Sequence, residues 1–195
     1  MSEMAEVYGQ TEFGMTCAYA EKAMQFLSGI GLVVEVVPGA AGFISDVAIV
    51  EGTLHVDPHC RVSGLLHEAG HLATMPAKYR PWMNGNLYAS FKRIYEDADN
   101  SRMELTEQQE RALLQTGDAE ATAWAFAAGK HLGAPERVII MGDEYNGEGK
   151  IIRMLLSAKS YLGINGLQHS GFCQARRHPF REGPVYPELN FWLQH

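Results

Sequence analysis

The sequence feature that most constrains this chain of 195 residues is the pentapeptide His67-Glu68-Ala69-Gly70-His71, which reads H-E-x-x-H. On a helix, residues four apart lie on the same face, so His67 and His71 can each give a ring nitrogen to one Zn²⁺ ion. Glu68 would lie beside the first ligand, where its carboxylate can take a proton from a metal-bound water. The spacing therefore predicts a metal helix with the minimal equipment for hydrolysing an amide.

The residues around the motif favour a helix that is packed on most sides. Most apolar residues of the segment fall on faces away from the two histidines: Leu65, Leu66, Ala69, Leu72 and Ala73. Pro76 predicts the end of the helix, and Asp57-Pro58 predicts an N-cap followed by proline at the first helical position. The alternative interpretation is a metal-free amphipathic helix whose histidines simply face solvent.

The composition indicates an ordinary globular protein, since 46% of the residues are hydrophobic and 20% are charged. The length predicts one domain over residues 1–195, with residues 1–14 as a loose lead-in. The net charge of −7 argues against a direct nucleic-acid partner. Three cysteines without a C-x-x-C pair, no apolar run of about 20 residues and no signal peptide together predict a cytoplasmic protein without a membrane partner.

The order of the periodic segments predicts an α+β fold. Strand patterns occupy residues 32–37, 43–50 and 53–56, and the last two should form a hairpin. Helical patterns occupy residues 16–27, 87–98, 106–114, 118–132 and 150–162, and Thr106-Glu107-Gln108-Gln109 fits a capping box at the start of the third of them. We expect a small antiparallel sheet packed against the metal helix and a second ligand helix, a minimal zincin-like fold with a helical C-terminal cap. One sheet edge should lie beside the metal helix and offer backbone groups to an extended peptide.

A catalytic zinc site takes a third protein ligand, which the chain must supply from elsewhere. The best source is the segment 117–128, where acids precede small residues that let two helices approach closely. Asp118 and Glu120 are the two candidates, and they lie about 200° apart around a helix, so both cannot face one metal. Asp118 follows Gly117 and could alternatively serve as an N-cap.

With these residues in place, the chain resembles the ImmA/IrrE-like metallopeptidases, a family of gluzincins. The resemblance covers about residues 17–129: a strand-rich lead-in, Arg61, the H-E-x-x-H motif and an acid ahead of an x-Ala-x-x-aromatic-Ala segment. The family pattern is roughly E-x-[QE]-A-N-x-F-A, and its zinc-binding Glu falls on Asp118. The later positions of the pattern fall on Glu120, Thr122 and Trp124.

The chain departs from this family at two points. Aspartate is one methylene shorter than glutamate, so the two helices must sit closer if Asp118 is the ligand. Asp118 also follows His71 by 47 positions, more than in the family, which predicts an insertion near residues 77–105. The resemblance favours Asp118 as the third ligand and leaves Glu120 as the alternative.

The resemblance implies zinc-dependent peptide hydrolysis in a regulatory role, in which a repressor-type protein partner is cut. Two other functions stay open: a metal-binding module that grips a partner without cutting it, and hydrolysis of a non-peptide amide. A hydrolase also needs a donor that stabilises the developing oxyanion, and the candidates are Tyr79, Tyr145, His169 and Arg176.

Overall fold

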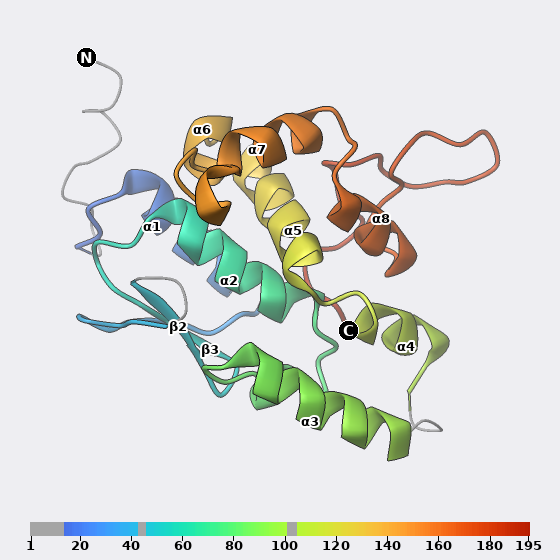
Figure 1. The fold of residues 1–195 in the computed structure, drawn as a ribbon, viewed down its shortest axis with the longest axis horizontal. Coiled ribbons are helices and arrows are strands. Elements are labelled where there is room, and N and C mark those ends of the chain that lie inside the picture. Colours follow the sequence, from blue (N-terminus) through green and yellow to red (C-terminus); the bar gives the residue numbers. More distant parts are fainter. Residues whose placement is uncertain (1–13, 43–45, 101–104) are drawn as a thin grey trace.

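The structure is a computed structural model that describes residues 14–42, 46–100 and 105–195. These residues form eight α-helices and one small three-stranded sheet, which confirms the α+β class. Figure 1 shows α2 and α5 at the centre of the molecule, with the sheet and α3 on one side and α6 and α7 on the other. In the described parts of the chain, no helix is long and apolar enough to cross a membrane.

The helices follow the predicted order closely up to α5. They are α1 (Ala18–Gly29), α2 (Val62–Thr74), α3 (Leu87–Asn100), α4 (Glu107–Leu113), α5 (Asp118–His131), α6 (Glu136–Ile139), α7 (Gly149–Ser157) and α8 (Leu162–His169). Two short 3-10 helices, η1 (Arg80–Trp82) and η3 (Tyr145–Gly147), lie in the connections. The capping box predicted at the start of α4 is present, because the side chains and backbone of Thr106 and Gln109 bond reciprocally.

The sequence patterns missed part of the C-terminal half. The single helix expected at 150–162 ends at Ser157, and α8 begins separately after a turn in which Lys159 has a φ of 56°. The four-residue helix α6 was not predicted either. The C-terminal region is helical as far as His169, and the remaining residues run back along the core without a further helix. The expected lead-in falls almost wholly outside the described residues.

The sheet contains β1 (Val34–Val36), β2 (Val47–Val50) and β3 (Thr53–Val56), in the order β1-β3-β2. The predicted hairpin of β2 and β3 is confirmed, although residues 43–45 of the expected second strand lie outside the described residues. The prediction of an all-antiparallel sheet is wrong, because β1 runs parallel to β3. Alternating patterns do not distinguish the two directions. Here the chain crosses between β1 and β2, so that β3, with Leu54 and Val56 fully buried, becomes the central strand.

The sheet edge beside α2 is β2, since α2 contacts both β2 and the central strand β3. Part of that edge is already covered by the chain itself. The N–H of Gly85 donates to the carbonyl of Ile49 at 2.8 Å, and the N–H of Gly52 donates to the carbonyl of Met83 at 2.8 Å. The expectation that this edge offers its backbone freely to a peptide is therefore wrong at these positions.

Helix α2 ends as predicted but begins later than predicted. Its C-cap is Met75, directly before Pro76, whereas its N-cap is Arg61 rather than Asp57. The Asp57 carboxylate instead accepts backbone N–H groups from Gly39 at 2.6 Å and His59 at 2.8 Å. These two bonds hold the pKa of Asp57 below its usual value, because they favour the ionised carboxylate. Asp57 thus ties the turn after β1 to the turn before α2.

The centre of the fold is a close crossing of α2 and α5. Every residue of α2 is buried, as is α5 from Ala121 to Gly129. A methyl group at Gly70 would lie only 2.5 Å from the carbonyl oxygen of Ala121. The close approach of two helices that the small residues of segment 117–128 predicted therefore occurs at Ala121. On another side the C-terminal segment closes the core, where the indole N–H of Trp124 donates to the carbonyl of Trp192 at 3.0 Å.

We expect Gly70→Ala to destabilise the protein by about 1–3 kcal/mol, because overpacking of a close helix contact forces the backbones apart. The matched control is Gly29→Ala at the end of α1, where an added methyl group meets no atom within 4 Å. Urea unfolding followed by circular dichroism measures both. Equal stabilities of the two variants would contradict the close crossing.

Candidate metal centre

Three side chains from α2 and α5 converge at the crossing of these helices. His67, His71 and Asp118 each offer a ligand atom, and these atoms lie within 4.8 Å of one another. The Asp118 Oδ1 lies 3.2 Å from the Nε2 of His71 and 3.9 Å from the Nε2 of His67. The two imidazole rings have their centroids 4.9 Å apart and are nearly perpendicular. We call these three residues the metal group, because they could hold a metal ion.

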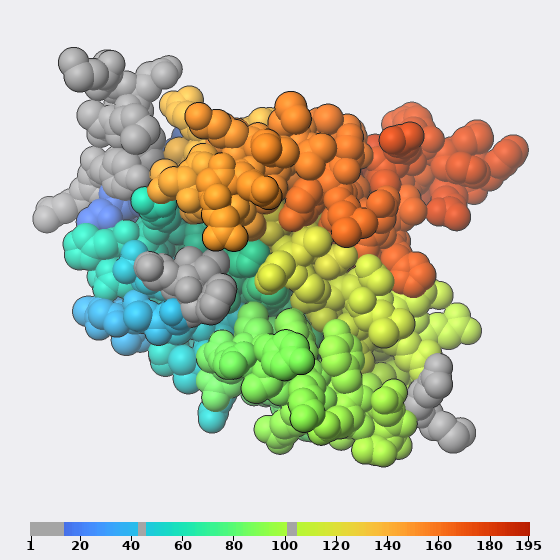
Figure 2. Space-filling view, in the orientation of Figure 1, coloured from blue at the N-terminus to red at the C-terminus, as the bar shows by residue number. Residues whose placement is uncertain are grey.

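Helical spacing and burial explain how the group is presented. His67 and His71 stand one turn apart on α2 and are both buried. The Asp118 side chain is 87% exposed, so the group is open to solvent on the α5 side. In the space-filling view, α3 (green) and the α7 region (orange) stand on opposite sides of the crossing (Figure 2). The two buried histidines are therefore reached from solvent on the side of Asp118.

Glu120 does not belong to the group. Asp118 is the first residue of α5 and Gly117 is its N-cap, so Glu120 is the third helical residue. From there its carboxylate lies back toward Gly117, where the backbone N–H groups of Gly117 and Glu120 favour its ionised form, as in the glutamate half of a capping box. Its side chain lies against α8, where a methyl group at Gly166 would overlap the Glu120 carboxylate. The N-cap role considered for Asp118 thus falls to Gly117, with Glu120 assisting.

The electrostatics of the group suit metal binding. Burial, and then the neighbouring His71, lower the pKa of His67 to about 3, so this imidazole is neutral at pH 7 with a free nitrogen lone pair. The hydrogen bond from His71 holds the pKa of Asp118 below its usual value, although burial opposes this. Asp118 is therefore an anion across the physiological range. Neutral imidazole and ionised carboxylate are the forms that bind cations.

The side of the His67 ring that faces away from Asp118 is also hydrogen-bonded. Its Nδ1 lies 3.3 Å from the Thr122 Oγ1 and 3.3 Å from the Tyr145 hydroxyl, and these two oxygens are 3.2 Å apart. Burial raises the pKa of Tyr145, so its hydroxyl keeps its proton at neutral pH. Such partners fix the orientation of a ligating histidine. The sequence reasoning missed this role for Thr122, although it follows Asp118 by four positions and so shares its helix face.

A short loop holds Tyr145 in place over His67. The Asp143 carboxylate accepts a hydrogen bond from Arg61 at 3.0 Å, and the Glu144 carboxylate accepts one from Ser63 at 2.5 Å, so the loop is tied to the start of α2. Tyr145 itself has a φ of 55°, a left-handed conformation that costs about 1–3 kcal/mol for a residue other than glycine. The ties to α2 offset this cost.

The second histidine of the group has a different environment. The Nδ1 of His71 is buried and has no hydrogen-bond partner among the described residues. The ring of Phe91 on α3 lies near the imidazole ring of His71, and the centroids of these two rings are 6.4 Å apart. His67 therefore has polar support behind its ring, whereas His71 is positioned by packing.

Glu68 lies on α2 between the two histidines in sequence and is only 5% exposed. Burial raises the pKa of its carboxyl group above the usual value, the charge of His71 opposes this rise, and the charge of Asp118 adds to it. The charges of His71 and Asp118 therefore both act on the Glu68 carboxyl group. A carboxylate with a raised pKa binds a proton more strongly than a solvated glutamate does, which suits a group that must accept and return a proton.

Of the four expected oxyanion donors, Tyr145 alone has a described contact with the group. This contact is on the Nδ1 side of His67, so it supports the ring rather than the face toward Asp118. The Tyr79 hydroxyl donates to Asp97 at 2.8 Å, His169 is exposed at the end of α8, and Arg176 lines a separate cavity.

Comparison of the chain with protein families, curated proteins and solved structures found no match. The resemblance to ImmA/IrrE-like metallopeptidases, and the insertion that it implies, therefore stay predictions.

We expect purified wild-type protein to carry close to one zinc ion, and His67→Ala and Asp118→Ala each to lose it, because each removes one of three ligands. Glu120→Ala is the matched control, since it removes a neighbouring acid that turns away from the group. It should retain zinc and lose about 0.5–2 kcal/mol of stability with its cap. Elemental analysis by mass spectrometry measures the metal. Zinc lost in Glu120→Ala but kept in Asp118→Ala would contradict this geometry.

We expect Tyr145→Phe to weaken zinc binding by about tenfold, because it removes a hydrogen-bond partner that orients His67 while Thr122 remains. Competition with a fluorescent chelator measures the affinity. Tyr79→Phe also removes one buried hydroxyl, but from the Asp97 contact, and should leave zinc affinity unchanged. An unchanged affinity in Tyr145→Phe would show that the hydroxyl has no supporting role.

Proposed function

We propose that this protein is a zinc-dependent metallopeptidase that cuts a peptide bond in a protein partner. The convergence of His67, His71 and Asp118 on one point, with Glu68 buried beside them, is the observation that carries this proposal. Two imidazoles and one carboxylate are a ligand set of catalytic zinc sites. The minimal zincin-like fold and the ImmA/IrrE-like resemblance belong to the same proposal.

The donor set fits zinc in kind and number. Two imidazole nitrogens and one carboxylate oxygen suit Zn²⁺ better than Ca²⁺ or Mg²⁺, which prefer oxygen ligands. The three atoms come from rigid helices, and three protein ligands leave one position open in a tetrahedral site. When bound, zinc supplies Lewis acidity, polarising a carbonyl and lowering the pKa of water.

Glu68 is the residue that we assign to proton transfer. Its carboxylate takes a proton from the attacking water and passes it to the leaving amine, so the same residue acts first as base and then as acid. The raised pKa of Glu68 supports this role, because a fully solvated glutamate would hold the proton too weakly to carry it. His67 keeps its neutral form, and both histidines would hold the metal.

A regulatory substrate, such as a repressor-type protein, is the partner class that the resemblance suggests. The partly covered edge of β2 supports limited rather than general proteolysis, since an extended substrate cannot pair along that whole edge while Met83 and Gly85 occupy it. A flexible loop of a folded partner needs fewer such pairs.

The second candidate is a metal-binding module that grips a partner without cutting it. It is favoured by the unpartnered Nδ1 of His71 and by the covered edge, because ligating histidines in active sites commonly have a second hydrogen-bond partner. The two functions differ in whether Glu68 is needed for any activity.

We expect zinc-loaded wild-type protein to cut a subset of peptides in a proteome-derived library, with cleavage read by mass spectrometry. Glu68→Gln should reduce cleavage by at least about 100-fold while zinc content stays the same, because the amide cannot accept the proton. Glu96→Gln, which changes an exposed acid on α3, is the control and should cut as wild type does. Zinc-loaded protein that cuts nothing would support the binding module.

A further inference from the structure

A second polar site lies beside the metal group, at the junction of α7, α8 and the segment 175–181. It is a cavity of about 480 Å³. Its walls carry four cationic side chains, Lys159, Arg176, Arg177 and Arg181, together with His178. No aspartate or glutamate is among the residues that line it.

This concentration of positive charge runs against the rest of the molecule. The chain has a net charge of −7 and 16 lysines and arginines, four of which gather around this one cavity. Where ion pairs are found in the described residues, they involve other cations. Like charges held together without a counterion repel one another. An anionic ligand would relieve that repulsion, so the charge pattern indicates the sign of the ligand.

The wall that carries the arginines is held in shape by the side-chain amides of Gln174 and Gln168. Gln174, which is 7% exposed, donates from its Nε2 to the carbonyls of Arg181 at 3.1 Å and Gly183 at 3.0 Å. From α8, the Oε1 of Gln168 accepts the N–H of Ala175 at 2.9 Å. The segment is therefore fixed to α8 before any ligand arrives, which lowers the entropy cost of binding.

The cavity and the metal group share a boundary. Tyr161 lines the cavity and its hydroxyl interacts with the side chain of Thr122, whose Oγ1 lies 3.3 Å from the Nδ1 of His67. Burial raises the pKa of Tyr161, and the negative charges of Asp118 and Glu120 raise it further, so negative charge lies near the cavity at this residue. An anionic ligand that extended from the cavity to the metal group would meet these carboxylates.

These features select one class of ligand. A cavity of about 480 Å³ accepts one or two side chains, within the usual range for small ligands, and is far smaller than a nucleic-acid duplex. A long polyanion would be repelled by Asp118 and by the net charge. A peptide can instead place carboxylates in the cavity and neutral residues at the metal group.

We propose that the basic cavity formed by Lys159, Arg176, Arg177 and Arg181 binds an acidic segment of the protein substrate. Aspartate or glutamate carboxylates in that segment pair with the arginines, and the neighbouring residues of the substrate then lie at the metal group. The term substrate rests on the proposed peptidase function, whereas binding of an acidic peptide does not.

The test is binding of a fluorescein-labelled peptide of ten residues with three glutamates, measured by anisotropy, against a twin with three glutamines. The protein is the full chain, zinc-loaded, in a Glu68→Gln background so that the peptide stays intact. The acidic peptide should bind at least about fivefold tighter than its twin at low salt, and the difference should shrink as salt screens the charges.

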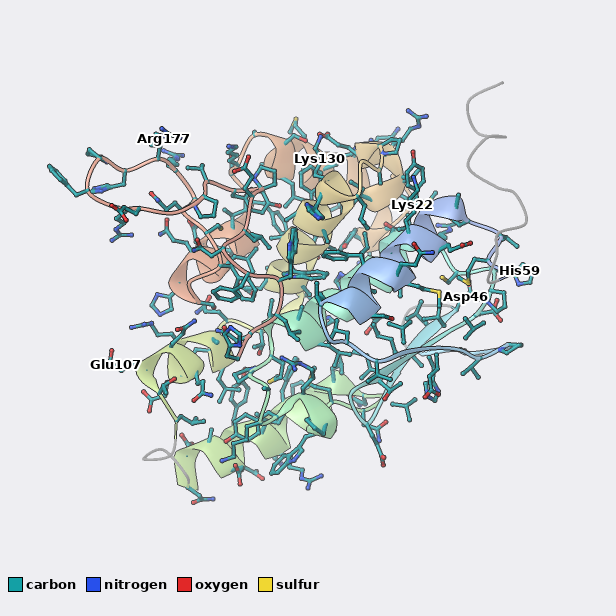
Figure 3. The ribbon with its side chains drawn as sticks, turned by 180° about the vertical axis from the view of Figure 1, so that it is seen from behind. Lys22, Asp46, His59, Glu107, Lys130 and Arg177 are labelled. Atoms are coloured by element: carbon teal, nitrogen blue, oxygen red, sulfur yellow. The ribbon has the colours of Figure 1, made fainter. Side chains whose placement is uncertain are left out.

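Arg177→Glu and Lys22→Glu form a matched pair, because they change the net charge equally on exposed side chains. Figure 3 shows Arg177 and Lys22 on opposite sides of the molecule. Arg177→Glu should weaken binding of the acidic peptide by about fivefold, and Lys22→Glu by less than about twofold. Equal effects of the two variants would show a general charge effect and overturn the proposal.

Binding measurements with other ligands test which class of ligand the cavity accepts. Equal binding of the glutamine twin would overturn the proposal. So would tighter binding of single-stranded DNA with the same charge, or equally tight binding of inorganic phosphate. Arg181→Glu gives a second variant within the cavity and should weaken binding as Arg177→Glu does.

The outcomes separate this inference from the peptidase function. Arg177-dependent peptide binding by a protein that holds no zinc and cuts nothing would overturn the peptidase and support the cavity. Zinc-dependent cleavage with Arg177-independent binding would overturn the cavity alone. With a substrate that is cut, Arg177→Glu in the active protein should raise KM and leave kcat unchanged, since the cavity does not touch the reacting atoms.

Discussion

The close crossing of α2 and α5 is the contact on which the rest of this structure depends. Because Gly70 has no side chain, the backbone at Ala121 approaches α2 closely enough for a short aspartate to reach His71. A bulkier residue at the crossing would separate the helices and leave the two histidines without their carboxylate. The alanine-rich stretch of α5 serves the same purpose along the buried length of the helix.

A second close approach arranges what surrounds the metal group. Helix α8 packs so tightly on the start of α5 that a methyl group at Gly163 would overlap the carbonyl of Ala119. The same contact holds Glu120 against Gly166 and places Tyr161 beside Thr122. The packing of α8 on α5 therefore holds Glu120 away from the metal group and brings the basic cavity close to that group.

The two histidines are held by different means, and this difference bears on function. A loop that is hydrogen-bonded to Arg61 and Ser63 at the start of α2 places Tyr145 behind His67, whereas His71 is held by packing against its neighbours. The loop that carries Asp143, Glu144 and Tyr145 thus supports one of the two histidines.

Local patterns determined much of this protein from the sequence alone. They predicted the H-E-x-x-H helix and its end before Pro76, the hairpin of β2 and β3, and the capping box at Thr106, because each depends on residues that are close together in the chain. Tertiary structure decided the parallel pairing of β1, the turning away of Glu120, the contact of Tyr145 with His67 and the gathering of four cations around one cavity. These features join segments far apart in the chain. Periodicity records which face of an element is buried, whereas the packing of whole elements determines which neighbour that face meets.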